Sequence, residues 1–392
     1  MRLHLSKNSC QGQSFSEMHP KGISYGQLKD WFYQFSRRRL LMLVYIHIPY
    51  CDSKCHYCSF NTYVDKFDTR EAYMHALYQQ IVFELERFGA KENSIETLFI
   101  GGGTPSTVAP ELYAPIFALL RPYLQKDAEI TTEANPNSAT KTWLEGMKEL
   151  GVNRVSFGVQ SFNAEKLKRL NRAHNPQQAK DAIAHAHTLG FKHISLDLIY
   201  NYQGDTESLL LKDIETAFTL PIDHISAYEL TIEDGTKFAS TPEVRQDDEN
   251  LAFFVTEQIE ARGFKAYEIS NFGTYQSKHN KGYWEIKDYI GAGAGAVGFL
   301  KERRFYPQTA IEAYVENPLH ISEEVLTEEE LLTEKIFLGL RSDVGIEKAS
   351  LSVAMIQRAT LLCDEKKLSQ TTTHFYNENF FLSDELSLYI LG

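Results

Sequence analysis

Short runs of β-branched and aromatic residues alternate with longer amphipathic stretches along the chain after residue 42. The short runs are typical of buried parallel strands, and the longer stretches are typical of helices that cover such a sheet. Six repeats of this kind predict an α/β fold, a partial (βα)6 barrel similar to a TIM barrel. The predicted strands are 43–48, 96–100, 129–133, 154–158, 193–198 and 224–229, and the predicted helices include 70–88, 140–150, 177–189 and 208–218.

The pattern divides the chain into three predicted parts. Residues 1–41 form an N-terminal extension without a core element, 42–305 form the barrel core with an accessory segment, and 306–392 form a small C-terminal α+β appendage that resembles a winged helix. Helices at 327–340 and 350–362 and a hairpin at 375–385 make up this appendage.

The extension allows two other interpretations. Because the core pattern begins near Met42, we hypothesise that translation starts there rather than at Met1. The arginine-rich segment before it also looks like an export signal, but the apolar run that follows is short and contains His47. We therefore interpret this run as the first core strand.

Composition narrows the class of protein. The chain has 392 residues, of which 43% are hydrophobic and 23% charged, enough for one barrel-sized domain with an appendage. A net charge of -12 without a basic stripe argues against binding to nucleic acid. No run reaches the roughly eighteen apolar residues of a membrane span, and few cysteines suit a reducing compartment. We expect a cytoplasmic protein whose membrane contacts, if any, are peripheral.

Three cysteines follow the first predicted strand in the pattern CxxxCxxC, at Cys51, Cys55 and Cys58. Only Cys10 and Cys363 lie elsewhere, too few nearby for a four-thiolate zinc site. The pattern favours an iron–sulfur cluster with one iron left open to another ligand. Plain free thiols are one alternative. A zinc site that recruits His56 is another, although a short loop closes poorly around one ion when this residue lies between two of its cysteines.

A glycine cluster, GGGTP, follows the second predicted strand, where Gly102, Gly103 and Thr104 let the backbone approach a ligand closely. It matches neither the dinucleotide pattern GxGxxG nor the phosphate loop GxxxxGK[ST], and alone it would be an ordinary turn. Polar residues also stand at the carboxyl ends of later predicted strands, where barrel ligands gather: Glu133, Gln160 and Asp197. Taken singly, each is more simply a satisfied polar group at a loop.

Together, YIHIPYCDSKCHYC and FIGGGTPS resemble the radical S-adenosylmethionine (SAM) superfamily. The resemblance implies that the three thiolates hold a [4Fe–4S] cluster, that SAM chelates the fourth iron, and that the glycine motif receives its amino group. An aromatic ring at Tyr57 would pack against the adenine. The resemblance also assigns a set of residues to contacts with SAM or close to it, namely Tyr45, Glu133, Gln160, Arg172 and Asp197.

Within this superfamily, EANPNS, RVSFGVQSF and KLKRLNRAH resemble the coproporphyrinogen dehydrogenase-like branch, over most of residues 43–390. Oxygen-independent coproporphyrinogen III dehydrogenases (HemN) carry a fourth cysteine two residues after the third, where this chain has Phe60. The related HemW heme chaperones lack that cysteine and share HNxxYW, which stands here as residues 279–284, from His279 to Trp284. The chain therefore resembles the HemW family.

The HemW resemblance implies a protein that binds heme, SAM and the cluster and delivers heme to apo-hemoproteins such as respiratory enzymes, with a homodimer as one arrangement. The alternative is an enzyme, an oxygen-independent coproporphyrinogen III dehydrogenase. His279 is the candidate axial ligand of heme, and the alternative is that the aromatic residues of the motif pack in the core while its His–Asn pair caps a turn. Two departures from the family pattern affect the substrate side: YNYQGDT at 200–206 lacks a glycine and a proline, and Val297 replaces a common histidine.

Overall fold

The computed structural model describes residues 41–392. The predicted N-terminal extension, apart from Leu41, lies outside the described residues, and so does the segment on which the hypothesis about the translation start depends. Among the described helices, none is both long and apolar enough to cross a membrane.

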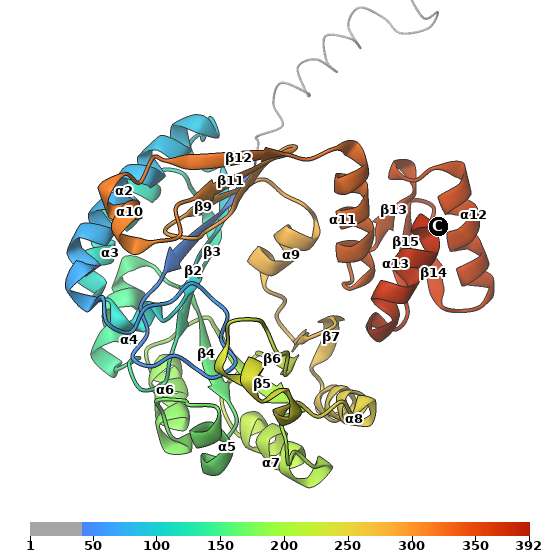
Figure 1. Cartoon of the computed structure of the whole chain (residues 1–392), viewed down its shortest axis with the longest axis horizontal. Coiled ribbons are helices and arrows are strands. Elements are labelled where there is room, and N and C mark those ends of the chain that lie inside the picture. Colours follow the sequence, from blue (N-terminus) through green and yellow to red (C-terminus); the bar gives the residue numbers. More distant parts are fainter. Residues whose placement is uncertain (1–40) are drawn as a thin grey trace, which may run out of the picture. The chain divides into compact units, whose positions relative to one another are not determined.

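The six predicted strands form, and they pair in parallel in the order of the chain (Figure 1). Most of their residues are buried, because helices cover one face and the barrel interior lies on the other, although β3 is mostly polar. The strands are β1 (Met42–Ile48), β2 (Ile95–Gly102), β3 (Leu124–Ala134), β4 (Arg154–Gln160), β5 (His193–Tyr200) and β6 (His224–Glu229).

Further strands extend the sheet at both edges, so the barrel is open. Beyond β1 come β9 (Tyr289–Ala292), β10 (Gly298–Leu300), β11 (Arg303–Pro307) and β12 (Ile321–Val325), and beyond β6 come β8 (Asn271–Gly273) and β7 (Lys265–Glu268). The domain boundary predicted at residue 306 falls inside β11, so the core sheet continues past it. β12 is an edge strand, and its exposed charged residues protect it from further pairing. These residues explain why the sequence becomes more polar there.

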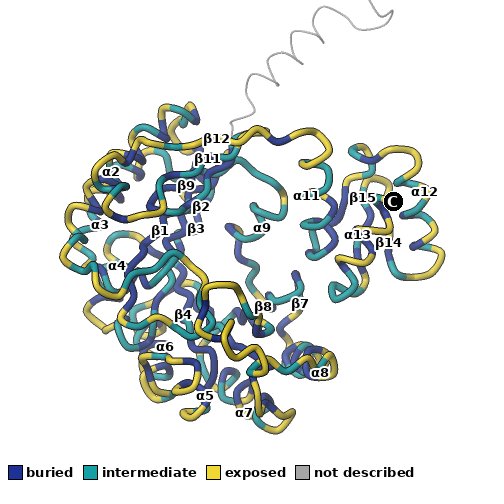
Figure 2. Tube along the Cα trace, in the orientation of Figure 1, coloured by how far each residue is buried: buried dark blue, intermediate teal, exposed yellow. Residues whose placement is uncertain are grey.

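Helices cover the outer face of the sheet, with buried inner sides and exposed outer sides (Figure 2). Side-chain caps begin several of them: Thr140 and Thr206 accept from backbone amides, and Asn175 forms a capping box. The covering helices are α2 (Arg70–Arg87), α3 (Pro110–Leu120), α4 (Lys141–Leu150), α5 (Ala164–Arg169), α6 (Pro176–Thr188), α7 (Glu207–Phe218), α8 (Glu249–Glu260) and α10 (Ile311–Glu316). The short α9 (Lys278–Trp284) instead lies beside the opening of the barrel (Figure 1).

The C-terminal part has its own small core. It combines α11 (Glu328–Leu340), α12 (Val353–Asp364) and α13 (Ser383–Leu391) with a sheet of β13 (Ile346–Glu347), β15 (His374–Asn377) and β14 (Leu368–Gln370). The predicted hairpin at 375–385 is wrong, because β15 pairs with earlier strands and the chain then enters α13. Asp384 and Glu385 in the first turn suit a helix N-terminus.

Single turns of 3-10 helix complete the described secondary structure. They are η1 (Phe67–Thr69), η2 (Pro105–Thr107), η3 (Lys237–Ser240), η4 (Pro242–Val244), η5 (Lys348–Ser350) and η6 (Phe380–Leu382). Of these, η2 continues the glycine motif after β2, and η3 contacts the cysteine loop.

Candidate functional site

The cysteine loop follows β1 at the carboxyl edge of the parallel strands and is fixed by backbone contacts on both sides. The His56 amide donates to the Leu170 carbonyl at 3.2 Å, and the Phe238 amide donates to the His56 carbonyl at 3.0 Å. The Asn171 side chain donates to the Lys54 carbonyl at 2.8 Å. The ends of α5 and η3 therefore hold the loop that presents the three thiols.

The thiols lie in partly buried surroundings, close to the cationic side chain of Arg172. Burial raises the pKa of Cys51 to about 12 and also raises the pKa of Cys58. An Arg172 Nη1 donates to Cys55 Sγ at 3.1 Å. Because iron binds thiolates, cluster assembly at this loop would release protons.

Within residues 41–392, no group of three or more His, Cys, Asp or Glu side chains is close enough to hold one metal ion. Thiolates that bind separate irons of a cubane lie farther apart than the ligands of a single ion, so this spacing does not conflict with a cluster. The ring of His56, considered above for zinc, hydrogen-bonds through Nδ1 with the Arg169 carbonyl at 3.0 Å.

The glycine motif packs directly on the cysteine loop. A Cβ at Gly103 would lie 2.8 Å from the Tyr50 carbonyl oxygen and 3.1 Å from Cys51 Sγ, so only glycine fits. Gly102 has φ +114°, a conformation that side chains rarely adopt. Thr104 Oγ1 lies 3.3 Å from Cys51 Sγ. The two motifs predicted to share a cofactor are therefore in contact.

The remaining predicted SAM residues fall into two groups. Tyr57 and Arg172 lie beside the cysteines, with Arg172 Nη1 3.5 Å from the Tyr57 hydroxyl. Tyr45, Glu133 and Asp197 line a cavity of about 200 Å³ inside the barrel, called here the polar cavity.

Gln160 ends β4, buried and with φ +69°. A residue other than glycine held in this left-handed region stores strain, which is common at ligand sites. Asn201, in the departing segment 200–206, has φ +63° and turns the chain after β5 where the family pattern has glycine and proline.

Sequence reasoning missed Asn135, which joins Arg172 to the end of the glycine motif. Its Nδ2 donates to Thr104 Oγ1 at 3.1 Å, and its Oδ1 accepts from Arg172 Nη2 at 2.6 Å. Its backbone amide donates to Ser106 Oγ at 3.1 Å. The sequence offered a signal for Asn135, because this polar residue stands two residues after Glu133 and directly after the carboxyl end of β3.

Two carboxyl groups in the polar cavity have raised pKa values. Burial, assisted by the nearby Asp197, raises the pKa of Glu133 to about 7. Burial raises the pKa of Asp197 to about 6. Glu133 also accepts from the Gly102 amide at 3.1 Å, which ties the cavity to the glycine motif. A cationic or hydroxyl-bearing ligand beside these groups would favour their ionised form.

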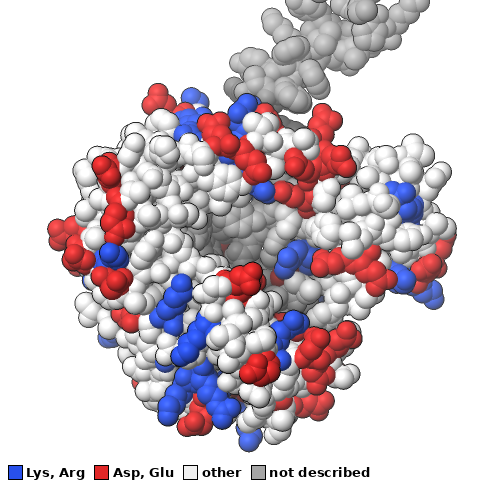
Figure 3. Space-filling model, viewed as in Figure 1, with Lys and Arg blue, Asp and Glu red and all other residues white. Residues whose placement is uncertain are grey.

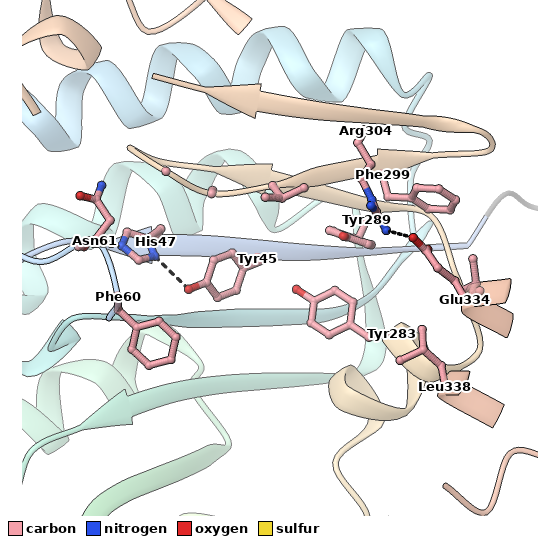
Figure 4. Close-up of a pocket in the computed structure, with 14 residues that line it drawn as sticks. Tyr45, His47, Phe60, Asn61, Tyr283, Tyr289, Phe299, Arg304, Glu334 and Leu338 are labelled. Atoms are coloured by element: carbon pink, nitrogen blue, oxygen red, sulfur yellow. Dashed lines mark hydrogen bonds and ion pairs between the residues drawn. The ribbon is translucent and has the colours of Figure 1, made fainter. Parts of the chain in front are cut away.

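A second cavity, of about 370 Å³, has several aromatic rings in its wall and is called here the aromatic cavity (Figure 4). An ion pair between Arg304 of β11 and Glu334 of α11 lies at its edge. The face of the molecule that holds α9 is visibly hollowed, and most of the atoms around the hollow are uncharged (Figure 3). The aromatic cavity is lined by Tyr45, His47, Phe60, Asn61, Tyr283, Ile286, Tyr289, Gly295, Ala296, Val297, Phe299, Arg304, Glu334 and Leu338.

The two cavities adjoin, because Tyr45 and Tyr283 line both of them. Val297 gives the aromatic cavity an apolar wall where the family pattern often has a histidine. Phe60, which replaces the fourth cysteine of the dehydrogenase pattern, lines the same cavity and is 65% exposed.

The HNxxYW segment forms α9, and its histidine is buried beside the polar cavity. His279 Nδ1 hydrogen-bonds with Thr97 Oγ1 at 2.6 Å, and Nε2 hydrogen-bonds with the Tyr283 hydroxyl at 3.0 Å. Burial lowers the pKa of His279 to about 3, so the ring is neutral. Both ring nitrogens are therefore engaged within the protein, and a role of this residue as a heme ligand stays a prediction.

Comparisons with known proteins agree with this geometry. The model of the radical SAM superfamily matches residues 45–217. A curated relative, "Heme chaperone HemW" of Bacillus subtilis, is 34% identical over 78% of this chain and 84% of its own length. The protein of the same name from Escherichia coli is 40% identical over 65% of this chain and 69% of its own length.

A solved structure shares the fold. The chain described as "Coproporphyrinogen III oxidase (HemN) from Escherichia coli is a Radical SAM enzyme" aligns with a TM-score of 0.75 at 18% identity, covering 92% of this chain and 93% of that one. At this identity the likeness establishes the partial barrel but not the activity. On the evidence of the curated relatives and the family model, the chain belongs to the HemW family of the radical SAM superfamily.

Proposed function

We propose that this chain binds heme beside a SAM-chelated [4Fe–4S] cluster and delivers the heme to apo-hemoproteins such as respiratory enzymes. The observation that carries the proposal is the aromatic cavity, whose volume of about 370 Å³ lies within the range of small-molecule sites. The flat apolar faces of a porphyrin suit rings such as Tyr283 and Tyr289. The names of the curated relatives support the same function.

The residues around the cysteine loop fit the superfamily's cofactors. Cys51, Cys55 and Cys58 would hold three irons of the cluster, and Gly103 lets the glycine motif pack directly against the loop that carries the thiols. When bound, the cluster supplies an open iron for SAM and a one-electron redox centre.

Charge in the site suits SAM as well. The Arg172 guanidinium offsets the negative charge of the thiolates and would pair with the carboxylate of SAM. Glu133 and Asp197 would accept from its ribose hydroxyl groups, and their ionised forms would stabilise its positive charge.

We expect His279→Ala to alter the heme spectrum of the protein. The neutral imidazole is the form that binds iron, and Nε2 becomes free once the Tyr283 hydroxyl moves away to pack on the porphyrin. A titration with hemin followed at the Soret band should show a shifted maximum and an affinity lower by about tenfold or more. His187→Ala, an exposed position on α6, is the matched control.

An unchanged Soret band in His279→Ala would contradict this ligand assignment. The next imidazole to replace would be His47, which lines the aromatic cavity and hydrogen-bonds with the Tyr45 hydroxyl at 3.0 Å.

The second candidate function is oxygen-independent coproporphyrinogen III dehydrogenase. The fold shared with the HemN structure over 92% of this chain is compatible with it. Phe60 opposes it, because that position holds the fourth cysteine in the dehydrogenase pattern and here forms an apolar part of the cavity wall. The two functions differ in whether a porphyrinogen is converted or a heme is carried.

A further inference from the structure

Arg154 is a buried cation that no side chain satisfies. It begins β4, is 2% exposed and lines the polar cavity. Its Nε is buried without a hydrogen-bond partner, and its guanidinium makes no hydrogen bond or ion pair with any residue from 41 to 392. Burying a cation without partners is costly in free energy, so such a group is expected to have a ligand or solvent of its own.

Carboxylates lie near Arg154 without engaging it. Glu129 already accepts three hydrogen bonds at and just before the start of α9. They come from the Tyr275 hydroxyl at 2.6 Å and from the amides of Lys278 at 2.9 Å and His279 at 3.1 Å. Burial acts to raise the pKa of this carboxyl, but the charge of Arg154 and these hydrogen bonds hold it below its ordinary value.

The two acids that line the cavity, Glu133 and Asp197, repel an incoming anion less than two ordinary carboxylates would. Burial raises the pKa of Glu133 to about 7, so near neutral pH this carboxyl is protonated for part of the time, and burial raises the pKa of Asp197 to about 6, although the nearby charge of Arg154 favours its ionised form. A protonated carboxyl donates a hydrogen bond to an anion instead of repelling it. The donors of the guanidinium remain available to a ligand in the cavity.

Two ligand carboxylates are candidates for pairing with Arg154, that of SAM and that of a ligand in the aromatic cavity, and their positions decide between them. The carboxylate of SAM would lie beside the thiols, where Arg172 already touches Cys55 Sγ at 3.1 Å. Arg154 is the first residue of β4 and Gln160 the last. Arg172, which donates to the Gly158 carbonyl at 2.6 Å, marks the cluster side of β4, and Arg154 lies four residues, roughly 13 Å, deeper in the barrel, so Arg172 is the nearer cation to a group chelated at the cluster. The aromatic cavity, in contrast, adjoins the polar cavity through Tyr45 and Tyr283.

We propose that Arg154 binds a carboxylate of the ligand whose ring occupies the aromatic cavity, namely a propionate of a tetrapyrrole. The inference rests on the proposed heme function and adds a residue that anchors the ligand. A planar guanidinium forms two parallel hydrogen bonds with a carboxylate, which fixes the orientation of the ring as well as its affinity.

The test compares hemin with hemin dimethyl ester, which keeps the ring and iron but lacks free carboxylates. Binding of both is titrated at the Soret band for the wild type, Arg154→Met, Arg154→Lys and the control Arg121→Met, whose arginine is exposed at the end of α3. We expect the wild type to prefer hemin, and we expect Arg154→Met to lose about tenfold or more in affinity for hemin while its affinity for the ester stays unchanged.

Equal loss for both ligands in Arg154→Met, or no loss for hemin, would overturn the proposal. So would loss of SAM binding by the reconstituted variant with hemin binding intact, because that result would assign Arg154 to SAM. A wild type that binds neither hemin nor its ester would contradict the proposed function itself, which is a separate outcome.

Folding of the variants is checked by thermal unfolding without ligand. Because Arg154 makes no pair within the described chain, Arg154→Met is expected to unfold within a few degrees of the wild type. If Arg154→Met does not fold, Arg154→Lys still decides the matter. A lysine keeps the charge but loses the bidentate geometry, so the preference for hemin over its ester must fall.

Discussion

Replacement of Cys55 with serine is expected to abolish assembly of a stable [4Fe–4S] cluster. Each thiolate binds one of the four irons of a cubane, so three thiolates leave one iron open and two would leave two open. A serine hydroxyl does not ionise readily enough to replace a thiolate. Cys55 also accepts a hydrogen bond from Arg172 at 3.1 Å, so the substitution removes one of the partners of this cation. After anaerobic reconstitution, the iron and sulfide content should fall from about four of each per chain to near zero.

The matched control is Cys363→Ser, since that thiol lies in the C-terminal part and outside the loop. It should retain full iron and sulfide. Cys55→Ser protein with a full complement of both, or wild-type protein that takes up zinc instead of iron and sulfide, would contradict the assignment of the loop.

The second large effect is expected for Glu133→Gln, which should make the ligand-free protein more stable at pH 8. Burial raises the pKa of Glu133 from 4.5 to about 7. A carboxyl with a raised pKa contributes stability that is fully present below about pH 4.5 and lost as the pH rises through about 7. Glutamine does not titrate, so the variant avoids this loss. The free energy of unfolding should therefore exceed that of the wild type by roughly 3 kcal/mol at pH 8.

Denaturant unfolding at pH 5 and pH 8 checks the effect, and Glu111→Gln, an exposed position on α3, is the control. The same variant should bind SAM more weakly, because it loses a negative charge that faces the ligand. A gain in stability of equal size at both pH values would show that the raised pKa is not its cause.

The parallel strands could be predicted from sequence because strands buried on both faces read as short apolar runs, as from Leu43 to Ile48. The edge strands from β9 to β12 could not be predicted in the same way. They are short, β12 is largely exposed, and their pairing depends on neighbours distant in the chain. The hairpin expected at 375–385 failed because aromatic residues favour strands locally, whereas packing placed Ser383–Leu391 in a helix.

Some residues of the candidate site could likewise be predicted from the sequence, and others could not. Spacing marked the cysteines, the glycine motif gained weight only together with them, and the strand-end rule marked Glu133 and Asp197. Arg154 escaped that rule because it stands at the beginning of a strand. Its interest comes from a lack of partners among the described residues, and only a three-dimensional arrangement can reveal this. The sharing of Tyr45 and Tyr283 by two cavities is likewise invisible in sequence.

The most direct measurement uses the full chain reconstituted anaerobically with iron and sulfide. One sample receives hemin followed by an apo-hemoprotein, and another receives a reductant, SAM and coproporphyrinogen III. We predict a Soret band that moves to the apo-hemoprotein in the first sample and porphyrinogen recovered unchanged from the second. SAM-dependent formation of protoporphyrinogen, or failure to bind hemin, would contradict a heme-carrying function.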